Sequence, residues 1–264
     1  MTRTALVTGA SSGIGAAVAA DLVARGYRVF GTTRDPSAVT DPLEGVEYLP
    51  LDLTDNAGID ACAAAAGDVD VLVNNAGESQ NGPFEELPAE ALQRLFQLNV
   101  LGQVRLTQLL LPGMRARGRG RVVMVGSMLA SFPLAHRSSY VASKAALKGF
   151  AYSLREEAAP YGVGVSTVEP GAINTGISER RVQYVSEDSP FADEYRTMVE
   201  ALNANEKRGV SADAVAATIA RAIEAPRPRP LYAVGSNAPL VFALRRLLPR
   251  SAVHRMVARR HGLR

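Results

Sequence analysis

Short strand-like runs and longer helix-like runs alternate along most of the chain, and this alternation constrains the fold more than any other feature. The apolar runs that we expect to be strands cover 4–8, 28–32, 46–51, 70–73, 121–126, 163–168 and 231–234. The runs with apolar residues at helical spacing cover 13–25, 55–66, 88–112, 138–159 and 211–224. Such alternation is typical of a mostly parallel sheet covered by helices on both faces. We therefore predict an α/β fold with one doubly wound sheet of about seven strands.

The first predicted strand leads directly into a glycine-rich turn and then into a helix. Gly9, Gly13 and Gly15 follow the strand, and an Ala/Val/Leu pattern continues from Ala16 to Arg25. Glycine allows a tight turn and lets phosphate oxygens approach the backbone. The helix N-terminus next to such a turn binds the pyrophosphate of a dinucleotide. The spacing G-x-x-x-G-x-G differs from the more familiar G-x-G-x-x-G, so a plain strand-to-helix connection is the alternative.

Tyr140 and Lys144 stand four residues apart in the segment YVASK, within a predicted helix. Residues at this spacing share a helix face, so the ammonium would lie beside the phenol. A nearby positive charge favours the phenolate, and we expect it to lower the pKa of Tyr140 toward neutral pH. Lysine is rare in this chain, because 26 of the 29 basic residues are arginines. An ordinary helix face is the alternative unless a second motif agrees.

Seven short segments agree with a single family in order and spacing. They are TGASSGIG at 8–15, Asp52 after the strand-like YLPL, NNAG at 74–77, Asn99, Ser127, Tyr140 with Lys144, and PG at 170–171. Over residues 2–235 the chain resembles the classical short-chain dehydrogenase/reductases, and most closely their steroid and retinoid branch of carbonyl reductases. The resemblance implies a Rossmann-type domain and an NAD(P)(H)-dependent oxidoreductase that interconverts a ketone or aldehyde and an alcohol.

The resemblance also implies a role for each catalytic residue. Tyr140 would be the general acid/base, which protonates the carbonyl oxygen during reduction. Lys144 would hold the nicotinamide ribose and lower the pKa of the tyrosine. Ser127 would donate a hydrogen bond to the substrate oxygen. Asn99 would support a proton relay through water and Lys144, and the alternative for this residue is a side chain that bonds a neighbouring carbonyl inside a helix.

The same resemblance implies which residues bind the dinucleotide. They are Gly9, Ser11, Ser12, Gly13, Ile14, Gly15, Thr33, Arg34, Asp52, Leu53, Asn75, Ala76, Gly77, Tyr140, Lys144, Pro170, Gly171, Ile173 and Thr175. Thr33 holds the position of the acid that selects NAD in this family, and Arg34 follows it. Because an arginine there pairs with the 2′-phosphate of NADP, we expect NADP rather than NAD. A shift of one residue would bring Asp35 into that position.

An insertion over the active site is predicted at 174–206, where polar, acidic and aromatic residues break the alternation. Ligands of open parallel sheets bind at the carboxyl ends of the strands, so this segment would form a substrate lid; a peripheral helical pair is the alternative. The expected substrate-contacting residues are mainly apolar, and they are Met128, Phe132, Leu134, Ile177, Tyr184, Phe191 and Met198. An apolar lining favours a small apolar carbonyl or alcohol as substrate.

Two other classes of protein share parts of the pattern. A non-catalytic dinucleotide-binding sensor would need the glycine turn but not Ser127, Tyr140 and Lys144. A related epimerase or dehydratase usually has G-x-x-G-x-x-G and a longer C-terminal domain. The complete series of motifs therefore favours the enzyme.

Composition and the first residues bear on location. No run approaches the length of apolar sequence that spans a membrane. The chain opens directly on a predicted strand, which leaves no room for a signal peptide. Cys62 is the only cysteine, so an internal disulfide is excluded and a cytoplasmic location is expected. No metal site is expected.

Residues 236–264 lie outside the resemblance and form a basic amphipathic extension to the catalytic domain, which we place at 1–235. The last forty residues carry nine arginines and no acidic residue, so their charge is +9, whereas the first 224 residues carry −6. Apolar residues at helical spacing on both sides of Pro249 predict two short helices. We expect the leucine face of this tail to pack over the substrate pocket or a partner subunit; a peripheral membrane contact is the alternative. Nucleic acid is not an expected partner, because interleaved aromatic residues and a recognition motif are missing.

Self-association is also expected. The helical runs 88–112 and 138–159 are long, and members of the family that the chain resembles commonly pair these faces. A homodimer or homotetramer is therefore predicted. The apolar residues of these runs fit contact with either the sheet or a partner.

Overall fold

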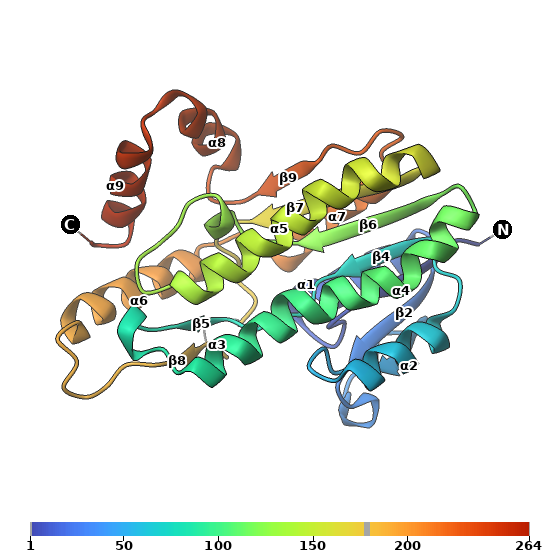
Figure 1. Ribbon diagram of the computed structural model, residues 1–264, viewed down its shortest axis with the longest axis horizontal. Helices are drawn as coiled ribbons and strands as arrows, with labels where there is room; N and C mark the ends of the chain where they lie inside the picture. Colours follow the sequence, from blue (N-terminus) through green and yellow to red (C-terminus); the bar gives the residue numbers. More distant parts are fainter. Residues whose placement is uncertain (1, 177–179, 264) are drawn as a thin grey trace.

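A seven-stranded parallel sheet lies between two layers of helices in the computed structural model, which describes residues 2–176 and 180–263 (Figure 1). The strand order is β3-β2-β1-β4-β6-β7-β9. The strands are β1 Thr4–Val7, β2 Arg28–Thr33, β3 Val46–Pro50, β4 Val71–Asn74, β6 Gly120–Val125, β7 Val163–Pro170 and β9 Leu231–Val234. The order reverses between β1 and β4, so the predicted doubly wound α/β fold is confirmed.

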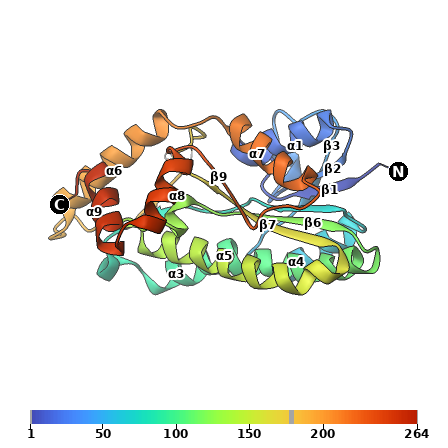
Figure 2. The ribbon, with the colours of Figure 1, turned by 90° about the horizontal axis from the view of Figure 1, so that it is seen from above.

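Helices cover both faces of this sheet. They are α1 Gly13–Ala24, α2 Asn56–Ala66, α3 Ala89–Phe96, α4 Gly102–Ala116, α5 Ser138–Ala158, α6 Ala192–Lys207, α7 Ala212–Glu224, α8 Ala238–Leu247 and α9 Arg250–Arg260. Figure 2 shows α3, α4 and α5 on one side of the sheet and α1 and α7 on the other. The two final helices, α8 and α9, lie beside α6 at one end of the molecule.

Alternating side chains of the central strands separate two hydrophobic cores. Leu6 and Leu72 face the core beneath α2, α4 and α5, whereas Val7, Val71 and Val73 face the core beneath α1 and α7. All five side chains are almost completely buried. Burial of each such side chain contributes about 1.5–3 kcal/mol. A shift of one residue would exchange the two sets, so the packing fixes the register of the sheet.

The helix predicted at 88–112 is divided and ends later than expected. A π-helical turn, Gln97–Leu101, separates α3 from α4, and α4 continues past Pro112 to Ala116. A proline removes only one backbone hydrogen bond, and the fully buried Met114 anchors the last turn to the core. The π-helical turn was not visible in the apolar pattern, because it changes the helix period over a single turn.

The segment predicted as a lid crosses the carboxyl ends of the strands. It contains β8 (Val182–Gln183), which pairs with β5 (Gln80–Asn81), and α6 follows. The hydroxyl of Tyr195 on α6 lies 2.8 Å from Asn81 Oδ1 and 2.9 Å from Gln183 Oε1. The buried Arg181 donates to Asn203 and Glu206. These contacts join α6 to the two-stranded sheet.

The tail helices pack toward the lid through residues other than the leucines. Val253 and Val257 of α9 are buried in a cluster with Phe132, and Phe242 of α8 makes an edge-on contact with the Phe132 ring at 5.0 Å between centroids. Three leucines of the expected inward face are instead exposed, namely Leu240 (52%), Leu247 (80%) and Leu248 (39%). The prediction that the leucine face of α8 packs over the substrate pocket is therefore wrong, whereas its packing on a partner subunit stays a prediction. The reason is that the β-branched and aromatic side chains of α8 and α9 occupy the space beside Phe132.

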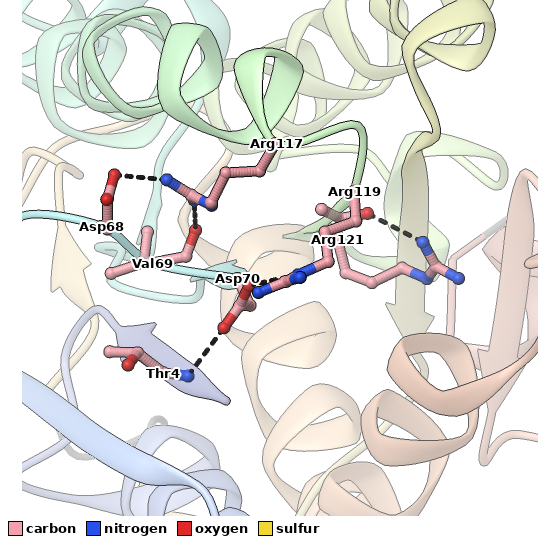
Figure 3. Close-up of polar contacts among 8 residues, drawn as sticks. Thr4, Asp68, Val69, Asp70, Arg117, Arg119 and Arg121 are labelled. Atoms are coloured by element: carbon pink, nitrogen blue, oxygen red, sulfur yellow. Dashed lines mark hydrogen bonds and ion pairs between the residues drawn. The ribbon is translucent and has the colours of Figure 1, made fainter. Parts of the chain in front are cut away.

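The opposite, amino-terminal edge of the sheet is fastened by charged side chains (Figure 3). The Asp70 carboxylate accepts a hydrogen bond from the Thr4 N–H at 3.1 Å and another from Arg119 Nε at 3.1 Å. Next to it, Arg117 at the end of α4 forms an ion pair with Asp68. The carboxylate of Asp70 thus bridges the start of β1 and the segment that enters β6.

Candidate active site

A continuous cavity of about 620 Å³ runs along the carboxyl ends of the strands, from the glycine turn to the tail helices. All the residues predicted to bind a dinucleotide line it, with the exception of Gly15. Ser127 lines it as well. The structure therefore brings together residues that are separated by more than 160 positions in the chain.

The glycine turn has the geometry that its spacing suggests. Gly9 and Gly13 have positive φ angles of 69° and 55°, which other residues rarely adopt. A Cβ atom on Gly15 would lie 2.1 Å from the Gly9 carbonyl oxygen, so this position tolerates no side chain. The side chain of Ser12, the N-cap residue of α1, makes no capping hydrogen bond to the first turn. The first amides of α1 are therefore available to a phosphate group.

Hydrogen bonds hold the NNAG segment against this turn. Thr8 Oγ1 accepts from the backbone N–H groups of Asn75 and Ala76, each at 2.9 Å. Asn75 Nδ2 donates to the Thr8 carbonyl at 2.9 Å. The neighbouring Asn74 points into the core, where it donates to Thr107 Oγ1. Asn75 thus faces the cavity, whereas Asn74 has a packing role.

At the end of β2, Arg34 lines the cavity and Asp35 does not. Thr33 and Arg34 line the cavity, and Arg34 is exposed. Asp35 turns away and accepts hydrogen bonds from the N–H and hydroxyl of Ser37, at 2.9 and 2.6 Å. It thereby caps the short turn Pro36–Ala38. The alternative register, with Asp35 in the acidic position, is not what the structure shows.

Asp52 lies on the other side of this part of the cavity. Its carboxylate accepts from the N–H and hydroxyl of Thr54, and these two bonds hold the pKa of Asp52 below its usual value. The positive charges of Arg34 and Arg94 act in the same direction on that pKa, more weakly. This end of the cavity therefore carries fixed hydrogen-bonding groups and two arginines.

Ser127, Tyr140 and Lys144 meet where β6 ends. Ser127 follows β6, and its Oγ accepts from the Leu129 N–H at 3.1 Å. Tyr140 and Lys144 lie one turn apart on α5, both buried, and Lys144 Nζ donates to the Val125 carbonyl at 3.0 Å. Burial lowers the pKa of Lys144 to about 8. A phenol, a hydroxyl and an amine thus lie together in one part of the cavity.

The pKa of Tyr140 does not follow the prediction made from the sequence. Burial is the largest influence and raises the pKa of Tyr140, while the charge of Arg137 and the nearby Ser127 hydroxyl lower it. The guanidinium carbon of Arg137 lies 4.4 Å from the centre of the Tyr140 ring, closer than Lys144 Nζ at 5.9 Å. The expected lowering by Lys144 is therefore wrong for the protein alone, because lost hydration disfavours the phenolate more than the neighbouring cations favour it.

Asn99 lies in the π-helical turn, behind the cavity wall. Its Oδ1 accepts from the Glu78 N–H at 2.8 Å, and its Nδ2 donates to the Glu78 carbonyl at 2.9 Å and to Ser143 Oγ at 3.2 Å. Gly77 separates Asn99 from Lys144, since a Cβ atom on Gly77 would lie 3.2 Å from Asn99 Oδ1 and 3.5 Å from Lys144 Nζ. The carbonyl that Asn99 bonds belongs to Glu78, 21 residues away and outside the helix, so it is not the helix-interior carbonyl of the alternative, and Asn99 also lies next to the lysine.

The residues predicted to contact the substrate agree least well with the lining of the cavity. Met128 and Phe132 line the cavity, whereas Leu134 and Met198 are buried in the cluster beneath it. Tyr184 and Phe191 do not line the cavity: Tyr184 directly follows β8, where its N–H donates to the Asn81 carbonyl, and Phe191 packs on the ring of His136. Ile177 lies outside the described residues.

Other residues complete the substrate side and were not predicted. The apolar ones are Leu129, Leu202, Val241, Met256 and Val257, and the polar ones are Ser79, Arg137, Arg180, Asn205, Glu206, Ser236, Arg260 and His261. Several belong to the tail, which no motif connects to the active site. Arg137 could have been found from its position three residues before Tyr140, which places it next to the phenol ring.

In the described part of the chain, no helix is both long enough and apolar enough to cross a membrane. Within residues 2–176 and 180–263, no group of three or more His, Cys, Asp or Glu side chains is arranged to hold a metal ion.

Known proteins with similar sequences share this architecture. The family described as "short chain dehydrogenase" matches residues 3–185. YusZ, an uncharacterized oxidoreductase of Bacillus subtilis (strain 168), is 32% identical over 269 residues, which cover 95% of each chain. Human 17-beta-hydroxysteroid dehydrogenase type 1 is 37% identical over 196 residues, which cover 68% of this chain and 60% of that protein.

Solved structures agree with the sequence matches. A short-chain dehydrogenase from Streptomyces avermitilis is 39% identical, has a TM-score of 0.82 and covers 93% of each chain. A short chain dehydrogenase from Burkholderia cenocepacia J2315 in complex with NADP is 25% identical, has a TM-score of 0.78 and covers 97% of each chain. The parallel sheet, the glycine turn and these similarities show that the chain belongs to the short-chain dehydrogenase family of NAD(P)-binding oxidoreductases.

Proposed function

We propose that the protein is an NADP(H)-dependent carbonyl reductase and alcohol dehydrogenase that acts on an apolar substrate. The observation that carries this proposal is the meeting of Ser127, Tyr140 and Lys144 at one point of the dinucleotide-lined cavity. A protein that only senses dinucleotides has no need of a buried acid and a buried cation at that point. The reaction class therefore follows from the chemistry of these side chains.

Each residue has a separate task in the proposed reduction. When bound, the nicotinamide supplies a hydride to the carbonyl carbon. Tyr140 holds a proton at neutral pH, because burial raises its pKa, and donates that proton to the carbonyl oxygen. Ser127 Oγ donates a hydrogen bond to the same oxygen and fixes its position. In the reverse direction, Tyr140 accepts the proton of the alcohol.

Lys144 and Asn99 support this centre. The ammonium of Lys144 has three donors, of which one is used by the Val125 carbonyl. The others are available to the ribose hydroxyls of the dinucleotide. Asn99 keeps the Gly77–Glu78 backbone in place beside the ammonium. We assign Asn99 to positioning, since its side chain is engaged with the backbone of Glu78.

Selection of NADP rests on Arg34. The guanidinium stands beside the cavity at the end of β2, and no acidic side chain occupies the position of Thr33. Asp35, the nearest acid in the sequence, is committed to Ser37. A 2′-phosphate would form a charge-assisted pair with Arg34. The solved relative from Burkholderia cenocepacia in complex with NADP supports this preference.

Apolar side chains favour an apolar substrate. Met128 and Phe132 line the cavity from the segment after β6, and Met256 and Val257 line it from α9. Similarity to 17-beta-hydroxysteroid dehydrogenase type 1 supports a carbonyl on a hydrophobic framework. Such walls select by shape and by removal of apolar surface from water.

The decisive experiment is a cofactor and substrate screen. The purified protein is mixed with NADPH or NADH and with a panel of apolar ketones and aldehydes, and loss of the reduced nicotinamide absorbance is followed. We expect turnover with NADPH for at least one apolar carbonyl. If NADPH binds with micromolar affinity but no carbonyl in the panel is reduced and no alcohol is oxidised with NADP⁺, the enzymatic proposal is rejected in favour of a sensor.

A homo-oligomer in the cytoplasm completes the proposal. Leu101 and Phe150, from the turn before α4 and from α5, are 50% and 47% exposed. Large apolar side chains on adjacent helices favour pairing with a second copy. Sedimentation velocity of the wild type and of a Phe150→Ser variant tests this arrangement, and a wild type that sediments as a monomer at micromolar concentration contradicts it.

A further inference from the structure

The substrate side of the cavity contains a buried arginine that the proposed reaction does not use. Arg137 immediately precedes α5, is 3% exposed and lines the cavity. Its Nη1 donates to Ser79 Oγ at 3.0 Å. Its Nε is buried and has no hydrogen-bond partner among the described residues. A buried N–H of a charged group that lacks an acceptor is destabilising.

The charges around Arg137 do not neutralise it. The charge of Glu206 acts on Arg137, and one Glu206 oxygen is paired with Arg181 at 2.5 Å. Burial lowers the pKa of Arg137 only to about 10, so the guanidinium stays charged at neutral pH. Burial also raises the pKa of Tyr195 to about 12, which leaves that neighbouring phenol neutral. This pocket therefore holds two guanidinium groups and one carboxylate.

The other groups that face this pocket do not supply the missing anion. His261, at the end of α9, has its pKa lowered by burial and is neutral at neutral pH. Lys144 adds a further cation 5.9 Å from the centre of the Tyr140 ring. Arg180 and Arg260 line the rim of the cavity and are exposed. The local excess of positive charge calls for an anionic ligand, because a buried charge without a partner is costly.

We propose that Arg137 binds a carboxylate carried by the substrate, close to the reacting carbonyl. This inference rests on the proposed reductase function and narrows its substrate to an oxo acid or hydroxy acid with an apolar arm. A planar carboxylate matches the fork geometry of a guanidinium and forms charge-assisted hydrogen bonds with it. Arg137 stacks on the Tyr140 ring with 4.4 Å between its guanidinium carbon and the ring centre. The carboxylate and the oxygen that Tyr140 protonates therefore lie within a few bonds of each other.

The apolar arm of such a substrate has its own place. Met128 lines the cavity next to Ser127, and Met256 and Val257 line it from α9. A neutral steroid or retinoid ketone would fill this apolar part but leave Arg137 without an anion. The two features together predict selectivity for amphiphilic oxo acids over neutral ketones of equal size.

Charge-matched probes test the inference. Benzoylformate carries a carboxylate directly beside its carbonyl, methyl benzoylformate lacks the charge, and para-acetylbenzoate carries the charge far from the carbonyl. Their affinities for the complex of the protein with NADP⁺ are measured by calorimetry, and their kcat/KM values are measured with NADPH. We expect benzoylformate to be preferred over the other two by about 10- to 100-fold in both measurements, which corresponds to a hydrogen-bonded charge pair.

Two variants test whether Arg137 causes the preference for benzoylformate over its methyl ester. Arg137→Gln is expected to lower the ratio of benzoylformate to ester by at least about tenfold, whereas the control Arg180→Gln leaves the ratio within about twofold. Because a ratio is measured, a general effect of Arg137 on Tyr140 cancels. Ser79→Asp places an internal carboxylate beside Arg137 and is expected to abolish the preference as well, which covers the case in which Arg137→Gln does not fold.

Each outcome is decisive. An equal loss for acid and ester in Arg137→Gln would show that this side chain acts only through Tyr140, and a preference that disappears in Arg180→Gln would move the anion to the rim. A wild type without any preference for benzoylformate overturns the inference while leaving the reductase function standing. Charge-dependent binding of benzoylformate without turnover of any probe would reject the reductase function and, with it, the assignment of the bound carboxylate to a substrate.

Discussion

Lys144 on α5 is tied to Val125 at the end of β6 by a hydrogen bond of 3.0 Å. The bond fixes the ammonium beside Ser127, which follows the same strand by two residues. The bond also keeps the ammonium group buried, and only 4% of Lys144 is exposed. The position that suits the chemistry therefore destabilises the protein when no dinucleotide is bound.

The first prediction concerns the pH dependence of stability. The pKa of Lys144 is lowered from 10.5 to about 8, so between these values the unfolded chain binds more protons than the folded one. The free-energy cost of burying the charged Lys144 is fully present below about pH 8. It is lost as the pH rises toward 10.5, the pKa of this lysine in the unfolded chain. We expect Lys144→Met to unfold with a free energy about 2–3 kcal/mol higher than the wild type near pH 7, and the gap to narrow toward about pH 10. Urea denaturation of both proteins without dinucleotide measures this difference; a gap that is independent of pH would contradict it.

The second prediction concerns the proton donor. Tyr140→Phe deletes the phenol oxygen and leaves the ring between Arg137 and Lys144. We expect kcat for carbonyl reduction to fall by about 10²–10⁴-fold. The affinity for NADPH, measured by fluorescence titration, should change by less than about twofold, because the phosphate-binding turn is untouched. Retention of more than about a tenth of the activity would remove Tyr140 from the catalytic role.

The third prediction concerns cofactor selection. Arg34→Ala should weaken binding of NADPH by about 10- to 100-fold and change binding of NADH little, since only NADPH presents a 2′-phosphate to the guanidinium. Asp35→Ala is the matched control, because Asp35 is committed to Ser37 and does not line the cavity. Equal losses for both dinucleotides in Arg34→Ala would identify Arg34 as a bystander.

The fourth prediction concerns the glycine turn. Gly15→Ala would bring a Cβ atom within 2.1 Å of the Gly9 carbonyl oxygen, so the turn must move away from its phosphate-binding geometry. We expect dinucleotide binding to become undetectable by fluorescence titration. Gly149→Ala is the control, since Gly149 lies in α5 with no atom within 4 Å of the added carbon. That variant should bind NADPH normally and gain up to about 1 kcal/mol of stability from better helix propensity.

Strand and helix positions could be read from the chain because local patterns determine them. Successive residues of a strand point to opposite faces of the sheet. Leu6 and Leu72 therefore lie in one core and Val7, Val71 and Val73 in the other, and the apolar residues of the sequence show this period of two. The π-helical turn at Gln97–Leu101 could not be read in this way. Its extra residue is stabilised by tertiary contacts, such as those of Asn99 with Glu78, and local sequence does not encode them.

The predictable part of the site is the part around the glycine turn. Gly9, Gly13 and Gly15 are constrained by backbone conformation, and this constraint leaves a pattern in the sequence. The substrate wall carries no such pattern. Met256 and Val257 reach the cavity from the far end of the chain through the packing of α9 on the lid, and ordinary apolar residues in a helix do not reveal such a contact.

The fifth prediction concerns the tail. Removal of residues 236–264 exposes the apolar cluster around Phe132 and deletes one wall of the cavity. We expect a melting temperature lower by several degrees and altered relative kcat/KM values across carbonyl substrates of different size, with NADPH affinity retained. Leu247→Ser is the control, because this side chain is 80% exposed and its replacement should change stability by less than about 0.5 kcal/mol. Unchanged melting of the truncated chain would show that the tail packs only loosely.

The hydrogen bonds of the Asp70 carboxylate imply that the two edges of the sheet differ in their tolerance to mutation. Because it joins the Thr4 and Arg119 segments at the amino edge of the sheet, the strands are held together far from the catalytic groups. Loops at the opposite edge can then acquire insertions, deletions or new side chains without the loss of strand pairing. In laboratory evolution, libraries confined to the lid and the tail should therefore yield mostly folded variants, whereas random changes around Asp70 should reduce expression whatever the substrate.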